Sequence, residues 1–198
     1  MSAPAPTPGR FRLALAVRVL DAGGIVGHPT EGVYGLACDP LDANAAARLI
    51  GLKGRPPEAG FILIADDEAR LAPWLGKLPA AARRRMRRTW PGPVTWVAPA
   101  GEAVPDWITG GRGTVAVRVT AHPVAAALCA AFAGALVSTS ANRHGRPPAR
   151  EALAARRALG GAVDLYLPGR AGPLGGPTEI RDALTGAVLR PAPGRRAG

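Results

Sequence analysis

Short apolar runs alternate with amphipathic segments along the whole chain, and no long linker interrupts them. Apolar positions at helical spacing predict five helices, at Arg12–Ala22, Ala43–Gly51, Pro79–Arg88, Pro123–Phe132 and Arg150–Leu159. Short β-rich runs predict strands at Ile25–His28, Phe61–Ile64, Val94–Ala98, Thr114–Val119, Ala135–Val137, Val163–Leu167 and Val188–Arg190. Helices and strands in alternation are typical of a single α/β domain.

The length of 198 residues and the apolar fraction of 47% suit one domain with a packed core. We expect this domain over residues 11–191, between a Pro/Ala-rich N-terminal tail of residues 1–10 and a C-terminal tail of residues 192–198. Both tails are predicted to be disordered, as chain ends without apolar anchors usually are.

The chain is strongly basic, with a formal net charge of +11. This charge favours a nucleotide, a nucleic acid or another polyanion as partner, although an arginine-rich composition alone could also produce it. Cys38 and Cys129 stand far apart, in no disulfide or metal-ligand pattern, and no segment resembles a secretory signal or a membrane span. We therefore expect a soluble cytoplasmic protein with no membrane contact.

The first candidate for chemistry is Lys53-Gly54-Arg55-Pro56-Pro57, at the end of a predicted helix. Lys53 is one of only two lysines in this chain. An ammonium beside a planar guanidinium in a rigid turn suits a polyphosphate, and we expect both side chains to be exposed in a cleft. The alternative is a solvated helix end, where cations are also favourable.

Four further polar clusters adjoin predicted strands, at whose carboxyl ends open α/β sheets commonly bind ligands. They are Pro29-Thr30-Glu31-Gly32, the face of Thr114, Ala116 and Arg118, Ser138-Thr139-Ser140-Ala141-Asn142, and Pro177-Thr178-Glu179-Ile180 with Arg190. Arg118 in mid-strand needs a carboxylate or a ligand anion. No histidine is spaced to activate a serine, so the hydroxyls are expected to bind rather than attack.

These blocks, together with Trp90-Pro91-Gly92-Pro93-Val94-Thr95, occur in the order found in the YrdC/TsaC family, and the chain resembles that family from about residue 11 to residue 191. The resemblance implies a YrdC-like twisted mixed β-sheet flanked by helices, a fold shared with dihydroxybutanone phosphate synthase. It also implies a nucleotidyltransferase that makes L-threonylcarbamoyladenylate from L-threonine, bicarbonate or carbon dioxide and ATP, and releases pyrophosphate. Partner proteins would use this intermediate to modify tRNA next to the anticodon.

The resemblance also implies roles for individual residues. Lys53 and Arg55 would be the catalytic cations on the triphosphate, and Thr114, Ser140, Asn142 and Arg190 would complete the nucleotide site. Threonine would be bound by Thr30, Arg118, Ser138 and Thr178, with Arg118 on its carboxylate. Magnesium is expected to arrive with ATP, because no carboxylate cluster provides a metal site of its own.

Three positions depart from the common family pattern. Gly32 stands where many members have a threonine, Ala59-Gly60-Phe61-Ile62-Leu63-Ile64 contains no histidine, and Pro177-Thr178-Glu179-Ile180 replaces a commoner Ser-Thr-Ile. These features resemble the short bacterial TsaC branch.

Three alternatives stay open at this point: a noncatalytic protein that binds double-stranded RNA or tRNA through the arginines of residues 83–88, a carbamoyl-transfer module and a sugar-phosphate enzyme. RNA binding requires an exposed stripe of cations, whereas the synthase requires Lys53, Arg55, Arg118 and Arg190 to converge on one cleft.

Overall fold

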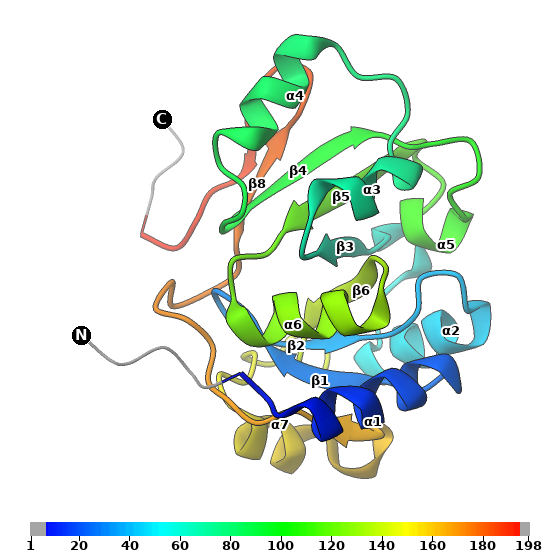
Figure 1. The fold of residues 1–198 in the computed structure, drawn as a ribbon, viewed down its shortest axis with the longest axis vertical. Helices are drawn as coiled ribbons and strands as arrows, with labels where there is room; N and C mark the ends of the chain where they lie inside the picture. The colour runs from blue at the N-terminus through cyan, green and yellow to red at the C-terminus, as the bar shows by residue number, and fades with distance from the viewer. Residues whose placement is uncertain (1–6, 195–198) are drawn as a thin grey trace.

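Most apolar runs of the sequence become strands of one mixed β-sheet. Figure 1 shows this sheet, with its flanking helices, in the computed structural model of the protein. The structure describes residues 7–194, and the predicted disorder of the two tails falls largely on residues 1–6 and 195–198, outside this range. The order of the nine strands is β7-β1-β2-β6-β3-β5-β4-β8-β9. Their bounds are β1 Val26–Pro29, β2 Tyr34–Ala37, β3 Ile62–Ala65, β4 Val94–Pro99, β5 Thr114–Val119, β6 Leu136–Ser140, β7 Leu165–Tyr166, β8 Glu179–Asp182 and β9 Val188–Arg190.

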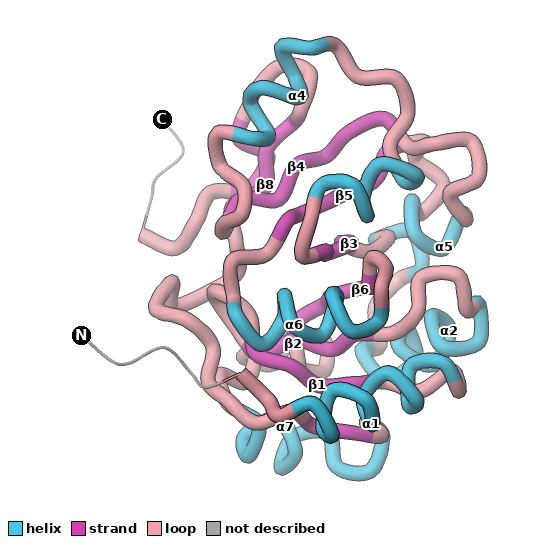
Figure 2. The backbone as a smooth tube through the Cα atoms, in the orientation of Figure 1, coloured by secondary structure: helices cyan, strands magenta, loops and turns pink. Residues whose placement is uncertain are grey.

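Seven α-helices and three 3₁₀ turns precede or connect these strands within the described residues. Figure 2 colours the helices cyan and the strands magenta. The helices are α1 Arg10–Asp21, α2 Ala43–Lys53, α3 Glu68–Leu71, α4 Ala80–Arg87, α5 Asp106–Thr109, α6 Pro123–Phe132 and α7 Ala152–Leu159. The predicted fold class, a twisted mixed sheet flanked by helices, is confirmed. The α2 prediction also holds at its start, where the side chain of Asp42 accepts hydrogen bonds from the amides of Asn44 and Ala45.

Two apolar clusters hold helices against the sheet. One joins α1 and α6 to β1, β3 and β6, through residues that include Leu20, Leu128 and Ile64. The other, larger cluster joins α2 and α7 to the sheet and includes Leu49 and Leu63. Ile64 and Leu63 belong to different clusters because neighbouring strand residues point to opposite faces. As the continuous apolar run Phe61–Ile64 predicts, β3 lies in the middle of the sheet.

The sequence did not predict β2, β8, α3 or α5. Tyr34–Ala37 pairs with β1 as a hairpin, yet its glycine and its position directly after a polar turn gave it the pattern of a loop. The strand β8 is Glu-Ile-Arg-Asp, which carries no apolar run; it forms because its backbone pairs in parallel with β4. On its other side β2 pairs with the distant strand β6, and β8 pairs with the distant strand β4. A local pattern cannot detect these long-range pairings.

Candidate functional site

A cavity of about 670 Å³ lies over one face of the sheet. Its floor is a cross-strand row on β6, β3, β5 and β4, in which Ser138 is paired with Ile62, Ile62 with Ala116, and Ala116 with Val97. Three of these residues are apolar. The floor is therefore flat and mostly uncharged, and the charged groups of the site come from the segments around it.

This position differs from the expected one at the carboxyl ends of the strands. The strand β3 runs antiparallel to β6, and β5 runs antiparallel to β4. Strands in such pairs end at opposite edges, so the polar residues cannot gather at one edge as they would in a parallel sheet. They meet instead above the middle of the sheet. The predicted face of Thr114, Ala116 and Arg118 is confirmed, since all three line the cavity.

Lys53 closes one side of the cavity from the last turn of α2. Its Nζ lies 2.6 Å from the carbonyl oxygen and 3.1 Å from Oγ of Ser140, and 3.0 Å from the carbonyl oxygen and 2.9 Å from Oδ1 of Asn142. Burial, followed by repulsion from Arg55, lowers the pKa of Lys53 to about 8. The ammonium therefore orders the loop after β6 as well as presenting charge.

The expectation that Lys53 is exposed is wrong, because only 6% of the residue is accessible. The reason is the loop of Ser140 and Asn142, which lies 87 to 89 residues further along the chain and encloses the ammonium. Nothing near Lys53 in the sequence indicates this contact. Arg55, two residues further, is half-buried as a cleft residue should be.

Arg55 and Arg112 flank the loop of residues 58–60. Arg55 lies over the ring of Phe61, 5.2 Å from its centroid, and donates to the carbonyl oxygen of Gly60. Arg112 donates to the carbonyl oxygens of Glu58 and Ala59. Burial and then repulsion from Arg112 lower the pKa of Arg55. Two guanidinium groups are thus held near each other by neutral carbonyl groups.

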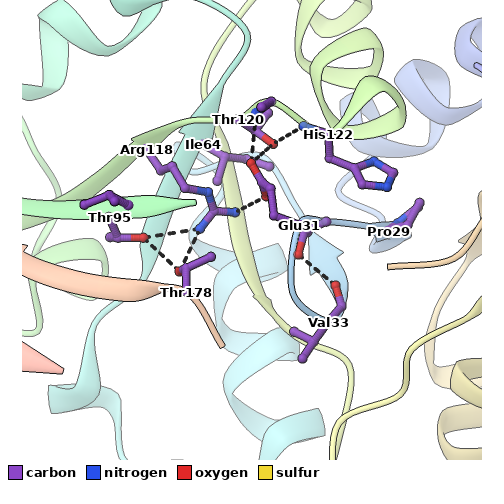
Figure 3. A network of polar contacts seen from close by, with 12 residues as sticks. Pro29, Glu31, Val33, Ile64, Thr95, Arg118, Thr120, His122 and Thr178 are labelled. Carbon is purple, nitrogen blue, oxygen red and sulfur yellow. Dashed lines mark hydrogen bonds and ion pairs between the residues drawn. The ribbon is translucent and has the colours of Figure 1, made fainter. Parts of the chain in front are cut away.

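Arg118 lies at the deep end of the cavity, in the network shown in Figure 3. Its Nη1 donates to Oγ1 of Thr95 and Oγ1 of Thr178, each at 3.2 Å, and its Nη2 lies 3.4 Å from Oε2 of Glu31. Glu31 also accepts hydrogen bonds from the hydroxyl of Thr120 and the amide of Ala121. Arg118 therefore has the carboxylate partner that was one of its two expected partners, and it lines the cavity as well.

The balance of forces on Glu31 favours its charged form. Burial by itself would raise the pKa of this carboxyl group, but the charge of Arg118 and the hydrogen bonds from Thr120 and Ala121 outweigh it and lower the pKa. Nearby, burial lowers the pKa of His28 to about 4, so this histidine is neutral at pH 7. Glu31 and Arg118 form the charged pair of this network, and the guanidinium of Arg190, which donates to the carbonyl oxygen of Thr178, adds a second positive charge close to Arg118.

The glycine at residue 32 is required by the backbone that packs against it. A Cβ atom at this position would overlap the carbonyl oxygen of Gly176. The amide of Gly172 donates to the carbonyl oxygen of Thr30, so the segment of residues 172–178 lies backbone to backbone on the turn between β1 and β2. The missing side chain at residue 32 is what allows this segment to bring Thr178 to Arg118.

All ten predicted site residues line this one cavity: Thr30, Lys53, Arg55, Thr114, Arg118, Ser138, Ser140, Asn142, Thr178 and Arg190. The sequence reasoning missed three polar residues that line it too, namely Arg112, Thr139 and His144. Arg112 lies in a glycine-rich turn with the sequence Gly-Gly-Arg-Gly, and this setting was the available signal. None of the lining residues in the described part of the chain is acidic.

The profile of the Sua5/YciO/YrdC family, described as telomere recombination, matches residues 18–192. The chain belongs to this family. It is 55% identical to the threonylcarbamoyl-AMP synthase of Halorhodospira halophila over 180 residues, which are 91% of this chain and 94% of that protein. It is also 55% identical to the threonylcarbamoyl-AMP synthase of Alkalilimnicola ehrlichii over 190 residues, which are 94% of this chain and 99% of that protein.

The fold agrees with a solved member of the family. The structure of P. abyssi Sua5 complexed with L-threonine superposes with a TM-score of 0.89 at 32% identity. The match covers 94% of this chain and 56% of the Sua5 chain, so Sua5 is the longer protein. In the described range of residues 7–194, no helix has the length and apolarity needed to cross a membrane.

Proposed function

We propose that this protein is a threonylcarbamoyl-AMP synthase, which makes the intermediate for threonylcarbamoyladenosine modification of tRNA. The observation that carries the proposal is the convergence of Lys53, Arg55, Arg118 and Arg190 on one cavity that has no acidic lining residue among those described. Such a site suits several anions at once, as a reaction between ATP, a carbamate and an amino-acid carboxylate requires. The names of the relatives that are 55% identical over nearly the whole chain support it.

The chemistry balances without a covalent enzyme intermediate. The amine of threonine adds to carbon dioxide and loses a proton, which gives a carbamate. A carbamate oxygen then forms a bond to the α-phosphorus of ATP, and the bond from that phosphorus to the bridging oxygen of pyrophosphate breaks. The protein has to hold the two anions in line and stabilise the charge that moves to the leaving group.

The two ends of the cavity suit the two substrates. At the deep end Thr30, Arg118, Ser138 and Thr178 are all buried, and they would bind threonine, with Arg118 on its carboxylate. Arg118 keeps its contact with Glu31 in this arrangement. A guanidinium has five donor hydrogens, so one group can serve both carboxylates.

The other end would bind the nucleotide. Lys53 and Arg55 would provide the catalytic charge on the phosphates, and Thr114, Ser140 and Arg190 would contact the nucleotide. Asn142 would fix the loop between the two subsites through its contacts with Lys53 and Ser140. These assignments follow the family pattern and agree with the position of each residue in the cavity wall.

Magnesium would be bound mainly by the phosphates of ATP and by water. The lining residues offer hydroxyl groups and amides but no carboxylate, and the described residues contain no cluster of three or more His, Cys, Asp or Glu residues. This donor set fits a cation that arrives with the nucleotide. When bound, the cation would neutralise phosphate charge. Lys53 and Arg55 would orient the phosphates from the protein side.

The product is an activated carbamate, so proteins that modify tRNA are the expected recipients, and the cytoplasm is the expected compartment. The alternative of a noncatalytic RNA-binding protein relied on the arginines of residues 83–88. Two of these are engaged, since Arg85 donates to the carbonyl oxygens of Ala183 and Leu184, and Arg87 pairs with Glu68. The convergence on the cavity therefore favours the synthase.

Pyrophosphate release from ATP by the purified protein tests the proposal. We expect release only when both L-threonine and bicarbonate are present, and much less with L-serine. Arg55→Ala should abolish release without unfolding the protein, because this side chain is half-buried at the cavity wall. Release that does not depend on threonine would point to another substrate, and the absence of nucleotide binding would favour the RNA-binding alternative.

A further inference from the structure

Arg112 is the one cation in the cavity wall that the proposed chemistry has not yet used. It lies in the turn between α5 and β5, and its residue is exposed at the opening of the cavity. Two of its five donor hydrogens bind the carbonyl oxygens of Glu58 and Ala59. The remaining three have no partner among the described residues, so the guanidinium is held in place with donors to spare.

Three cations form a series along this wall. Lys53 is buried, Arg55 is half-buried and Arg112 is exposed. Each neighbour repels the next, because Arg55 contributes to the lowered pKa of Lys53 and Arg112 to the lowered pKa of Arg55. Within the described residues, none of the three forms an ion pair with a carboxylate.

Uncompensated positive charge of this kind costs free energy in the free protein, and a bound polyanion would relieve it. A chain of phosphates has the right shape, since it extends over several ångströms with charge on each phosphate. The gradient of exposure also gives a direction. The α-phosphate, which reacts, would lie near buried Lys53. The two phosphates that leave as pyrophosphate would lie toward the opening, where Arg112 is found.

We propose that Arg112 is a further substrate-binding residue that contacts the terminal phosphates of ATP and holds the departing pyrophosphate at the opening of the cavity. This inference rests on the proposed synthase function. It assigns Arg112 to the leaving group, whereas Lys53 and Arg55 act nearer the reacting phosphorus.

The loop of residues 58–60 supports this assignment. Its three successive carbonyl groups bind Arg112 twice and Arg55 once, so the two guanidinium groups are fixed relative to each other. Gly60 has a φ of 59°, and a Cβ atom there would lie 2.7 Å from the carbonyl oxygen of Ile108 on α5 and 3.0 Å from Nη2 of Arg112. The backbone at Gly60 therefore leaves room for the guanidinium of Arg112 to lie close against the loop.

Calorimetric titration of the full chain with ATP, inorganic pyrophosphate and AMP, each in the presence of magnesium, tests the proposal. For Arg112→Ala we expect the affinities for ATP and pyrophosphate to fall about tenfold or more, the usual effect of losing a charged hydrogen bond. The affinity for AMP should stay within about twofold, because AMP lacks the terminal phosphates. Arg112→Lys keeps the positive charge but loses the planar set of guanidinium donors. Its affinities for ATP and pyrophosphate should lie between those of the wild type and the alanine variant.

Arg157→Ala is the matched control, since it removes an exposed arginine on α7 that does not line the cavity. It should change none of the three affinities. An equal loss for AMP and ATP with Arg112→Ala would mean that Arg112 only supports the loop, and unchanged pyrophosphate binding would also overturn the proposal. If Arg112→Ala unfolds, Arg112→Lys gives the same comparison.

Failure of this inference and failure of the proposed function can be distinguished. A wild-type protein with threonine-dependent pyrophosphate release, but with no effect of Arg112→Ala on ATP or pyrophosphate binding, would refute only the role of Arg112. Selective loss of pyrophosphate binding in a protein without threonine-dependent release would refute the synthase and leave a polyphosphate subsite at Arg112.

Discussion

At the scale of single residues, two side chains carry more than one function. Lys53 contributes charge to the cavity and also orders Ser140 and Asn142 through four oxygen contacts. Arg118 lines the cavity and is also the partner of Glu31 in an ion pair that is almost fully buried. Removal of Glu31 would leave the charge of Arg118 uncompensated, so Arg118 connects ligand binding to stability. Lys53 does so through the hydrogen bonds that order the loop after β6.

Replacement of Glu31 by glutamine should destabilise the protein by about 3 kcal/mol at pH 7, because Arg118 loses the charge that balances it. Urea unfolding gives this free energy directly. Glu102→Gln, which changes an exposed carboxylate, should leave stability unchanged. The expectation is wrong if the two variants are equally stable at pH 7.

The same variant changes the dependence of stability on pH. The pKa of Glu31 in the folded state lies below its ordinary value of 4.5, so the unfolded chain takes up this proton first as the pH falls. The contribution of the ion pair is therefore complete above pH 4.5 and is lost as the pH drops through the lower folded pKa. Wild-type stability should fall in this range more steeply than that of Glu31→Gln.

At the scale of elements, the site depends on how two loops lie on each other. The turn between β1 and β2 and the segment of residues 172–178 touch through backbone atoms, with no side chain at Gly32 between them. The segment then continues into β8 through Thr178, which reaches Arg118. The β1–β2 turn and the segment of residues 172–178, which are far apart in sequence, thus determine the shape of the deep end of the cavity.

Replacement of Gly32 by alanine should push this segment outward and move Thr178 away from Arg118. We expect the free energy of unfolding to fall by about 1–3 kcal/mol, as for other overpacked positions. The KM for threonine should rise, with a smaller change in kcat. Thermal unfolding and pyrophosphate release measured against threonine concentration would show both effects.

The matched control is Gly51→Ala. Gly51 is exposed on α2, and a Cβ atom there meets no neighbouring atom within 4 Å. Alanine in a helix should be neutral or stabilising by up to about 1 kcal/mol. A Gly32→Ala variant that behaves like this control would show that the two loops do not need their close contact.

At the scale of the whole molecule, one sheet connects residues from both halves of the chain. The larger apolar cluster contains both Tyr34 of β2 and Trp96 of β4, on opposite sides of the central strand β3. The cavity draws its lining from the same two sides. The molecule therefore has no natural dividing line across which one half of the site could unfold alone.

We expect unfolding in urea to be a single cooperative transition. The four tryptophans, at residues 74, 90, 96 and 107, lie on or between the elements from η2 (Ala72–Trp74) to α5, whereas circular dichroism reports helices throughout. Tryptophan fluorescence and circular dichroism should give the same midpoint. Two separate midpoints would mean that the β4 side unfolds independently of the β1 side.

The pattern of apolar and polar residues predicted an α/β domain, most helices and strands, and the segments that line the cavity. The predicted bounds of α6, β5 and β9 agree with the structure to the residue. The segments α6 and β5 carry a buried apolar pattern of their own, whereas β9 is exposed along its length. The ten predicted residues line one cavity. Local chemistry singled out their segments, because cations beside proline and glycine, and hydroxyl groups after a short strand, are unusual wherever they occur. The roles assigned to the individual residues came from the resemblance to the YrdC/TsaC family.

The arrangement of these residues depends on tertiary contacts that no local segment encodes. The burial of Lys53, the partner of Arg118 and the need for glycine at residue 32 all come from contacts with segments about 85 to 145 residues away, as does the pairing that makes β8 a strand. Arg112 joined the site for the same reason, since its position follows from the loop of residues 58–60. Local sequence encodes what a residue can do, whereas burial and charge balance depend on neighbours that the folded chain alone brings together.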